Sequence, residues 1–157
     1  MIVGVTGHQQ LPLGAVPLIA EQILNMLRHS GDALTGVTSL AAGADQIFAE
    51  AVLAVSGKLH VVVPSAGYET AFADAAARSS YFELLNRADV VETLPHAQPS
   101  SVAFFDAGRR VADLSELLIA VWDGEMPRGT GGTADVVQYA RARGSQIVIL
   151  WPAGLTR

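Results

Sequence analysis

Arg128-Gly129-Thr130-Gly131-Gly132-Thr133-Ala134-Asp135 is the stretch that decides the fold. It follows an apolar run ending in Trp122-Asp123 and leads into a segment with helical periodicity, so it predicts a strand, a glycine-rich turn and a helix start. The first N–H groups of a helix lack intrahelical partners, and glycines let a phosphate approach the main chain. We therefore expect a phosphate-binding loop formed by Arg128, Gly129, Thr130, Gly131, Gly132 and Thr133. The alternative is an ordinary strand-to-helix connection with Thr133 as N-cap.

Outward from this stretch, short β-branched runs alternate with longer Ala- and Leu-rich segments along the whole chain. This alternation is typical of repeated βα units around a mainly parallel sheet. Strands are predicted at residues 2–6, 36–39, 59–63, 90–93, 117–122 and 146–151. Helices are predicted at 14–29, 44–55, 69–87 with a break, 102–113 and 134–143. We expect a Rossmann-like, three-layer α/β/α fold with a mainly parallel sheet of about six strands.

Composition sets further expectations. The chain has 157 residues, half of them hydrophobic, which fits one domain over residues 1–157. Every apolar run is shorter than the roughly 18 residues of a membrane span, and the start lacks the pattern of a signal peptide, so we expect a cytoplasmic protein. There is no cysteine, and the histidines lack clustered acids, so we predict no metal site and no required cofactor. The net charge of −5 leads us to expect no nucleic-acid partner.

Three further loops follow predicted strands at the edge where open α/β sheets bind ligands. Their candidate ligand residues are Gly7, His8, Ala42, Gly43, Asp45 and Pro64. His8 is predicted either to bond a phosphate or to pack on a neighbouring loop. Asp45 is predicted either to reach a ribose hydroxyl or to accept backbone N–H groups at the helix start. Tyr68 either stacks on a purine or closes the core.

These loops carry a family resemblance. The segments Val3-Gly4-Val5-Thr6-Gly7-His8, Ser39-Leu40-Ala41-Ala42-Gly43-Ala44-Asp45 and Gly131-Gly132-Thr133 resemble the three signature loops of the SLOG superfamily. That superfamily unites the DNA-processing protein DprA with the lonely-guy (LOG) phosphoribohydrolases and includes many bacterial proteins. The resemblance spans nearly the whole chain and implies a Rossmann-like sheet that binds nucleotides, with the third loop on the phosphate. Leu40 stands where the family often has a glycine.

A second departure concerns catalysis. The lonely-guy enzymes place a glutamate shortly after the glycine-threonine turn, and this chain has Val136 at that position. Asp135 lies one residue earlier, about 100° around a helix, so it does not inherit the role. A catalytic carboxylate would have to come from Glu125, Asp123 or Glu69.

Three functions follow from this pattern. The first is a nucleotide sensor or carrier without turnover, which we favour because the phosphate loop is present and the glutamate is missing. The second is a hydrolase of a nucleotide N-glycosidic bond, and the third is an interaction module without a ligand. The predicted helix at 102–113 is apolar around much of its surface, so we also expect a homodimer.

Overall fold

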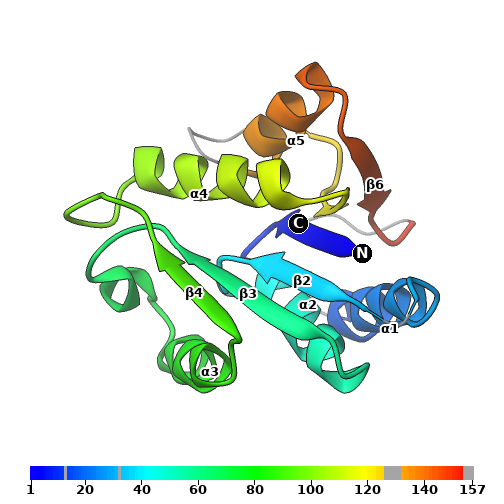
Figure 1. Ribbon diagram of the computed structural model, residues 1–157, viewed down its shortest axis with the longest axis horizontal. Coiled ribbons are helices and arrows are strands. Elements are labelled where there is room, and N and C mark those ends of the chain that lie inside the picture. Colours follow the sequence, from blue (N-terminus) through cyan, green and yellow to red (C-terminus); the bar gives the residue numbers. More distant parts are fainter. Residues whose placement is uncertain (13, 32, 126–131, 154–157) are drawn as a thin grey trace.

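The computed structural model describes residues 1–12, 14–31, 33–125 and 132–153. In this part of the chain, six parallel strands form one sheet with helices on both faces (Figure 1). The strands are β1 (Ile2–Gly7), β2 (Thr35–Thr38), β3 (Lys58–Val63), β4 (Val90–Thr93), β5 (Leu117–Val121) and β6 (Gln146–Leu150). The helices are α1 (Ala15–Arg28), α2 (Ala44–Ala54), α3 (Ala75–Asn86), α4 (Ser101–Leu114), α5 (Thr133–Ala142) and the 3₁₀ helix η1 (Tyr68–Ala71). The expected three-layer, Rossmann-like fold is confirmed.

The helix and strand bounds predicted from local sequence signals agree closely with those of the structure. Predicted and observed element ends differ by at most one residue. The break expected within residues 69–87 separates η1 from α3, and it ends at Asp74, whose carboxylate accepts the N–H of Ala76 at 3.2 Å. Ser100 caps α4 in the same way by accepting the N–H of Ala103 at 3.1 Å. Short polar side chains that satisfy the first helical N–H groups therefore fix both helix starts.

The strand order β4-β3-β2-β1-β5-β6 contains one reversal. The chain builds β1 to β4 outward in one direction, and α4 then carries it back across the sheet so that β5 pairs with β1 (Figure 1). The paired register ends with Gly7 opposite Val121. This is the switch point at which doubly wound sheets open a crevice at the carboxyl edge.

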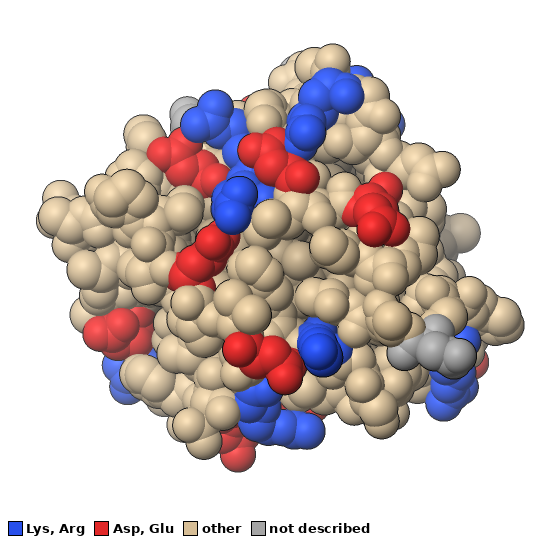
Figure 2. All heavy atoms as spheres, viewed as in Figure 1, with Lys and Arg blue, Asp and Glu red and all other residues tan. Residues whose placement is uncertain are grey.

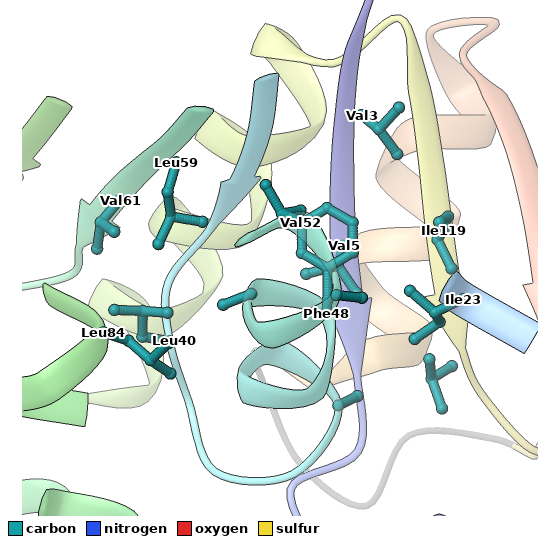
Figure 3. Close-up of a cluster of buried hydrophobic side chains, with 14 of the residues drawn as sticks. Val3, Val5, Ile23, Leu40, Phe48, Val52, Leu59, Val61, Leu84 and Ile119 are labelled. Carbon is teal, nitrogen blue, oxygen red and sulfur yellow. The ribbon is translucent and has the colours of Figure 1, made fainter. Parts of the chain in front are cut away.

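The two faces of the sheet carry separate hydrophobic layers. Helices α1, α2 and α3 pack on one face, and α4 and α5 pack on the other. Figure 3 shows the first layer, in which Phe48 and Val52 of α2 lie among strand residues such as Val5 and Leu59. Phe48 and Val52 are fully buried. The sheet is thus held from both sides, and its carboxyl edge is left for loops. Within the described residues, each helix is too short or too polar to cross a bilayer.

The apolar surface of α4 is largely covered within the chain. Ala103, Ala107 and Val111 are buried against the sheet, and Phe104 packs on the ring of Tyr68. Of the apolar residues that suggested a subunit interface, Val102 is the one that stands exposed, at 59%. Packing on the sheet and on neighbouring elements accounts for most of this surface, and the homodimer stays a prediction.

Close contacts at two glycines bring the carboxyl-edge loops together. A Cβ atom on Gly7 would lie 2.4 Å from Cβ of Ala44 and 2.9 Å from Cβ of Val121. Gly43 has φ +81° and ψ −125°, and a Cβ atom there would lie 2.4 Å from the carbonyl oxygen of Gln9. The β2–α2 loop therefore packs directly on the backbone of the β1–α1 loop, with no room for a side chain.

Gly43→Ala tests this contact, and Gly14→Ala is its matched control. Gly14 also has a positive φ, +84°, but an added Cβ there meets nothing within 4 Å. Gly14→Ala should lower the free energy of unfolding by about 1–2 kcal/mol, the cost of a left-handed conformation. Gly43→Ala adds a collision with backbone and should lower it by about 3 kcal/mol or more. Urea denaturation measures both, and equal losses would contradict the close loop packing.

Candidate functional site

A cavity of about 170 Å³ opens at the carboxyl edge of the sheet, at the switch point. All four predicted ligand loops contribute to it. Of the predicted ligand residues, the cavity is lined by Gly7, His8, Asp45, Pro64, Gly132 and Thr133. The residues Arg128, Gly129, Thr130 and Gly131 lie outside the described part of the chain. Ala42 lines an adjoining recess, and Gly43 packs against the backbone of Gln9 without lining the cavity.

Sequence reasoning missed the contribution of α4. Phe104, Gly108 and Val111 of this helix line the cavity opposite the loops. The one available signal was Gly108, a glycine inside a helix, where an added Cβ would lie 2.5 Å from Cγ2 of Val136. This glycine lets α4 and α5 approach closely, and so closes one wall of the cavity.

Two helices begin at the cavity on glycine residues. Gly43 precedes α2 and Gly132 precedes α5, so neither helix start has a side-chain cap. The suggestion that Thr133 is the N-cap of α5 is wrong, because Gly132 holds that position in extended conformation, and Thr133 is the first helical residue and is buried. Gly14 also precedes α1, so a glycine at the N-cap does not by itself indicate a binding site. What distinguishes α2 and α5 is that their first turns line the cavity.

His8 joins the elements on either side of the switch point. Its N–H donates to the carbonyl of Val121 at 3.2 Å, and its carbonyl accepts the N–H of Ala44, also at 3.2 Å. The ring atom Nε2 lies 3.3 Å from the backbone N–H of Asp123, which donates to it, and the ring meets Trp151 edge-on at 5.5 Å. The packing alternative therefore describes the visible contacts of His8, and a phosphate contact stays a proposal.

Asp45 is a buried carboxylic acid in the cavity wall. It is 7% exposed, and its Oδ2 accepts the N–H of Ala41 at 3.3 Å. Burial raises the pKa of Asp45 to about 7, against the opposing effect of hydrogen bonds from Ala41, Thr38 and Ser39. The carboxyl group fastens the β2–α2 loop to the start of α2; it accepts a backbone N–H, as one alternative expected, but from the loop rather than as a cap of the helix.

Leu40 shows what the departure from the family pattern means physically. It has φ +57°, a left-handed conformation that glycine adopts without strain. Its side chain is nevertheless fully buried in the core, and its N–H donates to Oγ1 of Thr38 at 3.1 Å. Burial of the leucine side chain offsets the backbone strain, so the loop keeps its shape without the glycine.

The candidate catalytic carboxylates lie outside the cavity wall. Asp123 approaches His8 at 3.4 Å between Oδ1 and Nε2, Glu125 is exposed, and Glu69 lies in η1. Among the described lining residues, Asp45 is the one that carries a carboxyl group. Val136, at the position of the lonely-guy glutamate, does line the cavity, and it is buried and apolar.

Several basic side chains are paired with acids on the side of the molecule that Figures 1 and 2 show. Figure 2 shows basic and acidic groups intermixed over this face, with no area of a single sign. Three of the ion pairs are Arg109 with Asp106, Arg110 with Glu92, and Arg143 with Asp113. No described residue that lines the cavity is a lysine or an arginine. Backbone N–H groups and helix dipoles are thus the positive features that the described wall offers to an anion.

Comparison with known proteins establishes the fold. No family model matches the chain, and neither does any curated protein sequence. DprA from Streptococcus pneumoniae matches with a TM-score of 0.72 and 20% identity, over 98% of this chain and 51% of that chain. DprA from Helicobacter pylori matches with a TM-score of 0.71 and 14% identity, over 98% of this chain and 66% of that chain. The molybdenum cofactor binding protein from Rippkaea orientalis matches with a TM-score of 0.58 and 16% identity, over 94% of this chain and 74% of that chain.

The chain therefore spans about half of one DprA chain and just under two thirds of the other, and it has their fold. The fold that the resemblance of the three signature loops implied is confirmed, and membership of the superfamily stays a prediction. The same likeness corrects the expectation that a net charge of −5 excludes nucleic acid as a partner. The Helicobacter pylori protein, of which the match covers 66%, binds single-stranded DNA, so the net charge of the chain is no ground for exclusion.

Asp45→Asn tests the burial of the cavity acid. The pKa of Asp45 rises from 3.8 to about 7 on folding, so the folded protein holds a proton that the unfolded chain releases. The free energy of unfolding should therefore fall as pH rises from about 4 to 7, by up to about 1.4 kcal/mol per pH unit from this group. An asparagine side chain does not titrate, so the stability of the variant relative to the wild type should increase over this range. Urea denaturation at several pH values gives the difference, and a flat difference would contradict a buried, protonated Asp45.

Proposed function

We propose that the chain binds a nucleotide by its phosphate at the switch-point cavity and acts as a sensor or carrier without turnover. The observation that carries the proposal is the convergence of two uncapped helix starts, α2 and α5, on one cavity. Each supplies a dipole of the sign that an anion needs, but the N–H of Ala44 at the start of α2 already donates to His8, so the N–H contacts are proposed mainly from α5. Gly7 and Gly132 line the cavity without a side chain, so a phosphate can approach the main chain at these two positions.

The size of the cavity supports a phosphate and part of a sugar. The described residues enclose about 170 Å³, below the roughly 300 Å³ at which pockets for whole small molecules begin. A nucleotide would therefore place its phosphate inside and extend its base beyond the wall. Arg128, Gly129, Thr130 and Gly131 are proposed as further phosphate ligands.

The chemistry of the wall favours binding over cleavage. Breaking an N-glycosidic bond requires an ionised carboxylate beside the sugar, to stabilise positive charge in the transition state. Val136 is apolar, and burial raises the pKa of Asp45 to about 7, which disfavours its ionised form. An N-glycosidase remains the alternative activity, with Glu125, Asp123 or Glu69 as the acid. Free base in the product mixture after incubation with nucleoside monophosphates would identify it.

Single-stranded DNA is the second candidate ligand, and the likeness to the DprA proteins favours it. A strand offers the cavity the same phosphate and base as a free nucleotide. It would also contact surface beyond the cavity, through several phosphates, and such binding weakens steeply as salt concentration rises. A single-stranded oligodeoxythymidylate and thymidine monophosphate, titrated over a range of salt concentrations, separate the two ligands.

Gly132→Asp and Gly132→Asn form a matched pair that tests the phosphate site. Gly132 has φ −76° and ψ 177°, the extended conformation of an N-cap, so both side chains can cap α5 and maintain stability. Only aspartate adds a negative charge where the phosphate is proposed to bind. We expect ligand at about 100 times its dissociation constant to raise the melting temperature of the wild type by about 5–10 °C, and that of Gly132→Asn by less, because the asparagine side chain competes for the N–H groups of α5 without adding charge. Gly132→Asp should abolish the rise.

The ligand panel for this measurement comprises mononucleotides, cyclic nucleotides, NAD, ADP-ribose and the oligodeoxythymidylate. Equal stabilisation of the two variants would show that the ligand binds away from α5. If no compound stabilises the folded wild type, the proposed binding is wrong for the whole panel. An interaction module without a ligand then becomes the better description.

A further inference from the structure

A second recess adjoins the cavity. It encloses about 60 Å³. Gln9, Ala41, Tyr68 and Phe104 line both the recess and the cavity, so the two spaces share a wall and continue into one another. The hollow at the carboxyl edge is therefore longer than the cavity alone, and it runs from the start of α5 to η1.

The two ends of this hollow differ in chemistry. At the cavity end, Gly132 and Thr133 present the start of α5. At the recess end, the rings of Tyr68, Phe72 and Phe104 line the wall together with polar groups. A nucleotide likewise carries a charged phosphate at one end and a flat aromatic base at the other.

The aromatic wall of the recess is rigid. The ring of Tyr68 meets the rings of Phe72 and Tyr81 at 5.3 Å and that of Phe104 at 6.0 Å, in edge-to-face geometry. Tyr68 is 5% exposed, whereas Phe72 and Phe104 are only partly buried. The central ring is thus fixed in the core, and the flanking rings keep surface on the recess. Such preformed surfaces bind bases by stacking, whatever the base.

We propose that this recess is the base subsite of the nucleotide site. The assignment rests on the proposed function, because the phosphate end fixes which part of the ligand reaches the recess. Gln9 is exposed at the rim, and its side-chain amide offers both a donor and an acceptor to the edge of the base.

Phe104→Leu tests the subsite, with Phe105→Leu as its control. Both residues lie on α4, but Phe105 lines neither the cavity nor the recess and instead lies under Arg109. The probes are AMP, GMP, CMP, UMP and ribose 5-phosphate, and isothermal titration calorimetry gives their affinities. The wild type should bind at least one nucleotide more tightly than ribose 5-phosphate. Phe104→Leu should lower the affinity for that nucleotide by about fivefold or more and leave the affinity for ribose 5-phosphate unchanged. Phe105→Leu should change neither.

Ribose 5-phosphate separates the two proposals. If the wild type binds it as tightly as every nucleotide, or if Phe104→Leu leaves nucleotide affinity unchanged, the base subsite is wrong while the phosphate site stands. A parallel loss of both ligands in Phe104→Leu also overturns the subsite, because a base contact cannot act on a ligand without a base. If the wild type binds none of the five probes, the phosphate site fails and the subsite fails with it.

Discussion

The close approach of β1 to its neighbours at the switch point is the constraint on which the candidate site depends. Gly7 ends the strand against Ala44 and Val121, with no space for a Cβ atom. Gly43 holds the next loop against the backbone of Gln9 in the same manner. These contacts set the distance between α2 and β5 at the end of β1, and the cavity opens beside them. Side chains at either glycine would separate the loops and remove the shared wall.

The fold could be predicted from sequence because its signals are local. β-Branched runs, glycine turns and the polar caps at Asp74 and Ser100 each determine one element, and their order fixes a parallel sheet. The loop residues of the site followed from the rule that parallel strands end at one edge. The part of the site that the sequence did not predict depends on contacts between distant segments of the chain. The path of α4 across the sheet places Phe104 and Gly108 in the cavity, and no periodicity within α4 encodes that crossing.

The net charge of the chain was a poor predictor of its partners, because a sum over all residues does not show where the charges lie. Several of the basic groups are neutralised by specific partners, such as Arg110 by Glu92 at 2.7 Å. The positive character of the described cavity wall instead comes from backbone N–H groups at two helix starts, which a count of lysines and arginines does not include. Net charge is therefore a poor guide to anion binding, and a protein that shares this fold binds single-stranded DNA.

Asp45 connects the stability of the loop with the proposed binding. Its carboxyl group fastens the β2–α2 loop by accepting the N–H of Ala41, and Ala41 also lines both the cavity and the adjoining recess. The fold favours the protonated acid, since burial raises its pKa to about 7. In the proposed complex, a phosphate in the same cavity adds negative charge and raises that pKa further. Fold and ligand then favour the same protonation state near neutral pH, which is the opposite of what an acid serving as an ionised catalyst would require.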